Sequence, residues 1–277
     1  MKRAARVVLW CAVLFFALQQ AQVHAGFLWD ALNWDGTDNV LKVGGGDVKA
    51  IYGGIYRWTG GNWHEETRKL DELTEDHAVV AIFKATALNG VSDESGDGEI
   101  TGYLALKVAQ VTHTGYKFTA PASPGWDPFG KLAANEALQV WFDTAENFTY
   151  ADADGRGDDV HSAVWGNLFG GFGFVGTSAV EAWATETSLT IYGGLNLTQN
   201  PGGFPFVKRQ SPLPPHPWVD LSIHAFGLGT TPQGNWTLSG NDELKFRLTP
   251  EPGTVTALLA MGGAAGLGLA LRRRKGA

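Results

Sequence analysis

Hydrophobic and polar residues alternate, or form short apolar runs, through most of the chain between residues 26 and 248. The runs are rich in β-branched and aromatic residues and are bounded by Gly, Pro, Asn and Asp clusters, which is typical of strands joined by turns. Short strands with glycine-rich connections predict one antiparallel β-sandwich or jelly-roll-like domain. The predicted strands cover residues 47–58, 78–88, 103–112, 137–142, 179–192, 218–226 and 236–248.

Two segments of this body depart from the strand pattern. Residues 64–77 contain Glu65 and Lys69 as an i,i+4 pair, but only Leu70 and Leu73 can be buried, so we expect a surface helix or a loop insertion. Residues 201–217 hold six prolines. Because proline cannot sit in a central strand, this stretch predicts an extended surface loop or a boundary before the last strands.

The first 25 residues have the pattern of an export signal. Basic residues at 2, 3 and 6 precede an apolar stretch at 7–18, and Val23 and Ala25 occupy the positions before a cleavage site. This order predicts a secretory signal peptide, residues 1–25. An uncleaved N-terminal anchor is the alternative, but the apolar stretch is short for a membrane span.

The last 28 residues have a second pattern of their own. After a Pro-Glu-Pro triplet, residues 253–271 form a run of 19 residues without a charge. As a helix this run spans about 28 Å, close to the roughly 30 Å hydrocarbon core of a bilayer. The triplet and the basic cluster that follows the run are Pro250, Glu251, Pro252, Arg272, Arg273, Arg274 and Lys275.

A basic cluster beside an apolar span marks its cytoplasmic end. The tail therefore predicts a transmembrane helix at 253–271, with a basic tail at 272–275 and the body outside the cytoplasm at the inner membrane. The alternative is a buried C-terminal helix of a soluble domain. The terminal basic residues and the lack of an amphipathic period argue against it.

The order of these three features closely resembles the PEP-CTERM sorting signal of Gram-negative bacteria, over residues 249–277. The resemblance implies recognition by an exosortase, a membrane-embedded, cysteine-dependent transpeptidase-like enzyme that cleaves near the Pro-Glu-Pro. It also implies use of the secretion machinery, and association with exopolysaccharide or biofilm matrix at the cell surface or in the extracellular matrix. The same tail is sometimes labelled an ice-binding-protein C-terminal motif, which is no sign of ice binding by the body.

Charge and cysteine content narrow the classes of function. Of 21 Lys and Arg residues, three lie in the signal and four in the terminal cluster, which leaves 14 against 28 acids and a charge of about −14 between the clusters. Such a surface repels nucleic acid. The single cysteine, Cys11, lies in the signal, so the exported body has no disulfide, thiolate metal site or cysteine nucleophile.

Motifs of catalysis are incomplete. The segment that begins at His64 resembles the helical zinc signature but has Arg68 where the second histidine must stand. Residues 176–180 lack the closing glycine of a nucleophile elbow. His113 and His224 lie within strand patterns, and we interpret them as structural or surface residues. We therefore expect no catalytic residue from motifs.

One acidic, glycine-containing loop is a candidate Ca²⁺ site, because hard cations prefer several oxygen ligands. An EF-hand frame fails there, since Tyr150 and His161 fall at the first and last ligand positions. A solvated acidic turn is the alternative, and the loop at 93–99 is a weaker case of the same kind. The candidate ligands are Asp152, Asp154, Asp158 and Asp159.

Ten tryptophans follow Ala25, and flat aromatic faces stack on sugar rings. Trp141 and Trp183 lie in apolar strand patterns and are expected in the core. Trp63, Trp126 and Trp236 lie near turns and are the candidates for exposure and ligand binding, with core or edge packing as the alternative. The sequence thus favours a non-enzymatic, glycan- or exopolysaccharide-binding body. The alternative is a secreted glycan-active hydrolase that uses paired carboxylates.

Overall fold

The computed structural model describes residues 31–43, 51–92, 98–143, 148, 161, 163–164, 166–225, 228–230, 236–238 and 242–249. These residues are mainly strands, which confirms the predicted β class. The expected signal peptide and transmembrane segment lie outside the described residues. Among the residues described, there is no helix with the length and apolar character needed to cross a membrane.

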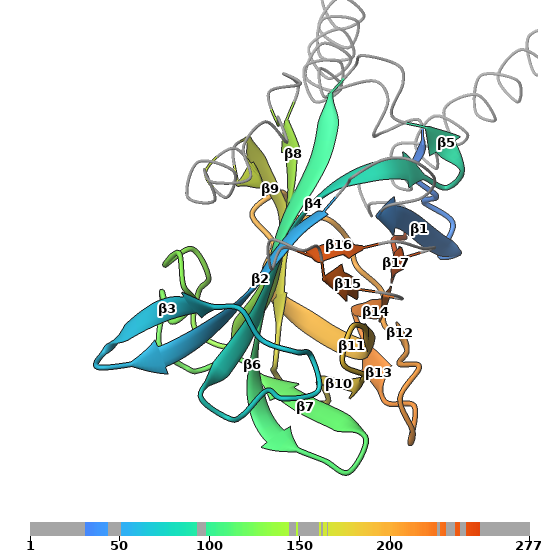
Figure 1. Cartoon of the computed structure of the whole chain (residues 1–277). Helices are drawn as coiled ribbons and strands as arrows, with labels where there is room; N and C mark the ends of the chain where they lie inside the picture. Colours follow the sequence, from blue (N-terminus) through green and yellow to red (C-terminus); the bar gives the residue numbers. More distant parts are fainter. Residues whose placement is uncertain are drawn as a thin grey trace, which may run out of the picture.

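The described part of the chain contains 17 strands (Figure 1). In chain order they are β1 (Asp38–Val43), β2 (Ile51–Thr59), β3 (Asn62–Glu66), β4 (His77–Leu88), β5 (Val91–Ser92), β6 (Glu99–Val111), β7 (Gly115–Thr119), β8 (Glu136–Asp143), β9 (Asn167–Gly173), β10 (Ala179–Ala184), β11 (Leu189–Gln199), β12 (Arg209–Gln210), β13 (Trp218–Val219), β14 (Leu221–Ala225), β15 (Leu228–Thr230), β16 (Trp236–Leu238) and β17 (Asp242–Arg247).

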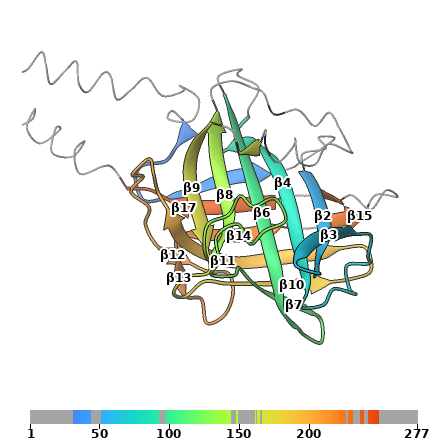
Figure 2. The same ribbon diagram turned by 90° about the vertical axis from the view of Figure 1, so that its left-hand side faces the viewer.

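Fifteen of these strands form one antiparallel sheet that closes on itself, and β12 and β13 form a separate ribbon. Closure follows because β6 pairs with β4 as well as with β8, so that a ring runs β4-β6-β8-β9-β11-β14-β17-β1. Figure 2 shows β9, β8, β6, β4 and β2 side by side in front, with β17, β14 and β11 crossing behind them. A sandwich has two separate sheets; here one continuous sheet folds over its own core.

Two long, bent strands make this closure possible. β6 has 13 residues and pairs with β8 along its first half and with β7 along its second half. β11 likewise pairs with β10 and then with β9. The register shifts between Val108 and Gln110 in β6 and between Leu197 and Gln199 in β11. Such bulges bend and twist a strand, and let it take part in both halves of a folded sheet.

Burial patterns distinguish strands covered on both faces from strands covered on one. β4 is an almost continuous apolar run, and residues 78–83 are all buried. One face of β4 and β6 lines the core, and the loop at 120–135 covers the outer face of β6 and β8 (Figure 2). β10 instead alternates, with Val180 and Ala182 buried and its other residues at least partly accessible.

The predicted surface helix at 64–77 is absent, and the loop alternative is confirmed. Its first residues belong to β3, which pairs with β2, and a loop follows. Leu70 and Leu73 are fully buried as anticipated. The hydroxyl of Tyr116 donates to the Leu70 carbonyl at 2.8 Å and accepts the Leu73 N–H at 3.0 Å. Burial of the two leucines outweighs the Glu65–Lys69 charge pair that a helix would have formed. The Leu70 N–H also donates to the Glu186 carbonyl at 3.2 Å, which holds the loop against the β10–β11 turn.

The first and last described strands lie side by side. Asp38 is opposite Arg247, and the Gly36 N–H donates to the Leu248 carbonyl at 2.9 Å. The proline-rich segment clamps the last strand, since Thr249 N–H donates to the Pro205 carbonyl at 3.2 Å. The register through β14 places the end of β17 beside the Gln199 half of β11. The chain therefore leaves the sheet at the end opposite the β10–β11 turn.

Candidate functional site

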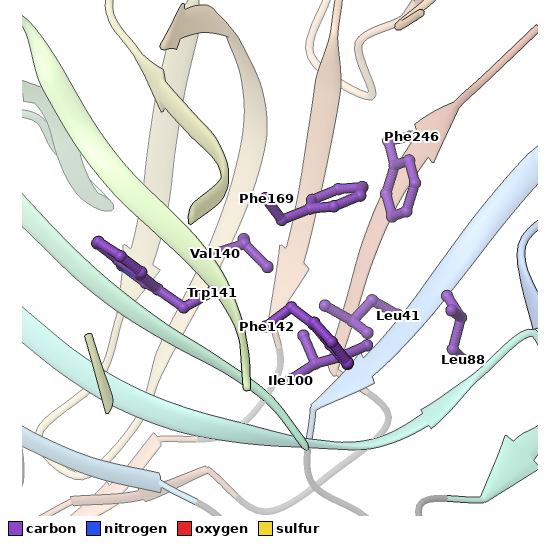
Figure 3. Close-up of a pocket in the computed structure, with 8 residues that line it drawn as sticks. All are labelled: Leu41, Leu88, Ile100, Val140, Trp141, Phe142, Phe169 and Phe246. Carbon is purple, nitrogen blue, oxygen red and sulfur yellow. The ribbon is translucent and has the colours of Figure 1, made fainter. Parts of the chain in front are cut away.

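The interior of the sheet is filled by side chains and leaves a cavity of about 10 Å³. That is about the space that one water molecule needs. Figure 3 shows aliphatic and aromatic side chains facing this cavity, with Trp141 pointing away from it. At this cavity the described side chains leave no room for a substrate. The residues that line the cavity are Leu41, Leu88, Ile100, Val140, Trp141, Phe142, Phe169 and Phe246.

Most predicted site residues lie outside the described residues. This holds for the sorting residues Pro250, Glu251, Pro252, Arg272, Arg273, Arg274 and Lys275, and for the candidate Ca²⁺ ligands Asp152, Asp154, Asp158 and Asp159. For Trp236 the structure describes the backbone, which pairs with Gly53 in β2. Among the side chains that are described, His, Cys, Asp and Glu form no group of three or more suited to a metal ion.

Trp126, one of the candidate ligand-binding residues, is packed against the sheet. Trp126 is 7% exposed, and its indole N–H donates to the Glu136 carbonyl at 3.0 Å. Trp63 is partly buried, and its indole N–H donates to the Trp126 carbonyl at 2.6 Å. The two tryptophans hold the loop at 120–135 and the β2–β3 hairpin together. Their turn-like surroundings are folded against the sheet, so neither indole face is an open platform.

A buried carboxylate fixes the same loop. Asp127 is 2% exposed and accepts hydrogen bonds from the Tyr103 hydroxyl at 2.7 Å and the Leu132 N–H at 2.8 Å. The N–H groups of Phe129 and Lys131 add longer contacts at 3.3 and 3.1 Å. Burial, and then the Asp127 charge, raise the pKa of Tyr103 well above its ordinary value. Asp127 therefore organises a turn.

A second buried carboxylate, Glu136, is fully used by polar neighbours. Its oxygens accept from Ala133 N–H at 2.8 Å, Gln139 at 2.7 Å, Thr198 at 2.9 Å and Gln199 at 3.1 Å. The residue is 0% exposed. A glycosidase needs an acid that reaches substrate beside a second carboxylate. Glu136 has no such access, and it joins β8 to β11 instead.

One hydroxyl–imidazole–carboxylate arrangement was not anticipated from the sequence. The Thr74 hydroxyl lies 2.7 Å from Nδ1 of His77, and Nε2 of His77 lies 3.2 Å from Glu66 Oε2. The order resembles a nucleophile with its base. However, the Thr74 hydroxyl also donates to Asp76 in a very short contact, Nδ1 also accepts the Thr74 N–H at 3.0 Å, and His77 is 0% exposed. The group closes a turn.

The charges around this turn are stabilised in their ionised form. The Thr74 hydroxyl is the largest influence on Asp76 and, against the opposing effect of burial, it lowers the pKa of Asp76 to about 2, with help from Arg57. Burial would raise the pKa of Glu66, but hydrogen bonds from His77 and Arg68 outweigh it and lower that pKa. The turn therefore anchors the loop at 67–76 through ion pairs.

Three tryptophans are exposed among the described side chains, and none was among the predicted ligand-binding residues. Trp58 is 47% exposed, Trp183 is 52% exposed and Trp218 is 56% exposed. Trp183 had been expected in the core. The alternation of β10 explains the error, because Val180 and Ala182 point inward and Trp183 therefore points outward. This signal was present in the sequence.

Trp183 and Tyr192 form what we call the aromatic pair, on the outer face of β10 and β11. Their ring centroids are 4.2 Å apart and their planes differ by 21°, so the rings are stacked. By contrast, Trp58 meets Trp63 edge to face, at 5.3 Å and 68°. Burial, and then the nearby Glu181, raise the pKa of Tyr192, so its phenol stays protonated to a higher pH than that of an ordinary tyrosine.

Polar side chains surround the aromatic pair. Glu181 pairs with Tyr192 across β10 and β11, and Lys117 of β7 pairs with Glu181. The Lys117 Nζ and a Glu181 carboxylate oxygen are 3.8 Å apart, and both side chains are at least one-third exposed. On the other side, His224 of β14 is opposite Tyr192 and is exposed. An aromatic surface with adjacent hydrogen-bond donors and an acceptor is suited to binding.

In comparisons with known proteins, no family model, no curated protein and no solved structure matches the chain.

Proposed function

We propose that the chain is an exported, non-enzymatic protein of the cell surface or extracellular matrix, with a body that binds glycan or exopolysaccharide. A signal peptide at 1–25 directs export, and a helix at 253–271 holds the chain in the inner membrane. An exosortase-like enzyme then cleaves near Pro250–Glu251–Pro252. The single observation that carries this proposal is the order of Pro-Glu-Pro, uncharged span and basic cluster at the end of the chain.

The fold supports this arrangement in one respect. Thr249 directly precedes the Pro-Glu-Pro and is tied by its N–H to the Pro205 carbonyl at the rim of the sheet. A processing enzyme would therefore meet the triplet directly after a residue that is held at the sheet. The described body is also mainly β, as the proposed sandwich or jelly-roll-like fold requires, although one closed sheet replaces two separate ones.

A secreted glycan hydrolase is less well supported by the described residues. Such an enzyme needs two carboxylates roughly 5–10 Å apart across an open site. The buried acids Asp127 and Glu136 accept hydrogen bonds from groups of the protein itself. The cavity inside the sheet has a volume of about 10 Å³. A binding body is the better interpretation, because the exposed aromatic rings need no further chemistry.

Substitution in the sorting triplet tests the proposal in the native host. With Glu251→Ala we expect the chain to accumulate in the inner-membrane fraction with the signal peptide removed and the C-terminal segment still attached. With Thr249→Ser, a neighbouring change outside the triplet, we expect normal processing. If both variants were processed and distributed like the wild type, cleavage would not depend on the triplet and the proposal would fail.

A further inference from the structure

The outer face of β10 and β11 presents an aromatic pair in which the fold uses only the two faces that stack on each other. Trp183 lies outside the buried core and is 52% exposed. Tyr192 covers one face of the indole at a centroid distance of 4.2 Å. With one face covered and half of the side chain accessible, the opposite indole face is open to solvent. Exposed aromatic surface of this kind is typical of recognition sites.

Stacking also fixes the orientation of the indole before any ligand arrives. A free tryptophan side chain loses rotamer freedom when it binds, whereas a ring already held against Tyr192 loses less. The backbone below is rigid, because β10 is paired on both sides, with β7 and with β11. The aromatic pair is therefore preorganised.

The polar rim indicates the class of ligand. Glu181 supplies an acceptor and Lys117 a donor, 3.8 Å apart, and Glu181 lies two residues before Trp183 on the same face of β10. Hydroxyl groups of a sugar both donate and accept hydrogen bonds, so they match this mixed rim. A polyanionic glycan would meet a body with an acidic excess of about 14 charges. Charge complementarity thus favours a neutral glycan whose pyranose ring lies flat on the indole.

The place of the aromatic pair in the fold agrees with this ligand. Trp183 is one residue from the end of β10, beside the β10–β11 turn, and pairs with Gly115 at the start of β7. The last described strand, β17, leaves at the other end of the sheet, where Thr249 contacts Pro205. A body held through its C-terminus would therefore point the aromatic pair away from the attachment.

We propose that the open face of Trp183, backed by Tyr192 and flanked by Glu181 and Lys117, is a binding site for a neutral pyranose polysaccharide. This site deepens the proposed function and rests on it, because it names where the exported body contacts glycan and what kind of glycan it takes.

The test is affinity electrophoresis, with intrinsic tryptophan fluorescence, of the chain as isolated from its host. The probes are soluble neutral glucan, galactan and mannan, with polygalacturonate as the anionic comparison. Wild type should bind at least one neutral polymer more tightly than polygalacturonate. Trp183→Ala should weaken binding at least about tenfold, as expected for the loss of a central aromatic contact. Tyr192→Phe should stay within about twofold, because the ring is kept.

Trp218→Ala is the matched control, because Trp218 is equally exposed at 56% and stacks on no described aromatic ring. It should bind within about twofold of wild type. The inference is overturned if no neutral polymer binds, if polygalacturonate binds best, or if Trp183→Ala binds like wild type. It is also overturned if sedimentation shows a dimer that only Trp183→Ala dissociates, because the face would then bind a second copy. These outcomes are independent of processing at Pro250–Pro252.

Discussion

Replacement of Asp127 by alanine is the sharpest test of how the outer cover of the sheet is held. The Asp127 side chain is 2% exposed and accepts from the hydroxyl of Tyr103 and the N–H of Leu132, residues that are 0% and 1% exposed. Each buried donor that loses its acceptor costs about 1–3 kcal/mol. With two such donors, and partial relief by entering water, Asp127→Ala should lower the free energy of unfolding by about 3–4 kcal/mol.

Urea unfolding, followed by tryptophan fluorescence, measures this loss. Trp126 lies next to Asp127 and is buried, so the folded variant should also show red-shifted emission as the loop at 120–135 loosens. Asp127→Asn keeps one oxygen acceptor and should lose less, about 1–2 kcal/mol. Asp71→Ala, at an exposed loop position, should stay within about 0.5 kcal/mol of wild type. A loss below about 1 kcal/mol for Asp127→Ala would refute the role of this carboxylate.

Two further predictions concern the core and the acid range. In Gly102→Ala the added Cβ would lie 2.1 Å from a ring atom of Phe83; this overpacking should cost about 1–3 kcal/mol in urea unfolding, and an unchanged midpoint would contradict it. Because Thr74 and Arg57 hold the pKa of Asp76 at about 2, below its ordinary 3.8, Asp76 contributes stability that is full above pH 3.8 and is lost as the pH falls through about 2. Asp76→Asn should therefore be less stable than wild type at pH 5, and the difference should shrink as the pH falls to about 2 and below. A difference independent of pH in urea titrations would count against the ion pair.

The sequence allowed the mainly β class and many strand positions to be predicted, because alternation and turn residues are local signals. The alternation in β10 predicts which of its residues face outward. Its inward Val180 and Ala182 fix Trp183 on the outer face, yet apolar composition alone suggested a core position. A strand's period of two is thus a better guide to exposure than its average hydrophobicity.

Other features could not be predicted, because they depend on contacts distant in the chain. Trp126 stands in a Pro/Gly-rich stretch that looks exposed, and it is buried because its loop folds back and its N–H finds the Glu136 carbonyl. Closure of the sheet depends on pairs such as Asp38 with Arg247, 209 positions apart. The alternation of apolar and polar residues in a strand is the same in a two-sheet sandwich and in a single sheet that closes on itself. It therefore cannot distinguish the two arrangements.

The intact mass of the protein isolated from its own host tests the central claim most directly. Export, anchoring and processing together predict a chain that begins at Gly26 and ends close to Pro250–Pro252, with any added mass confined to the new C-terminus. A full-length chain in the cytosol, with residues 253–277 still attached, would contradict the claim.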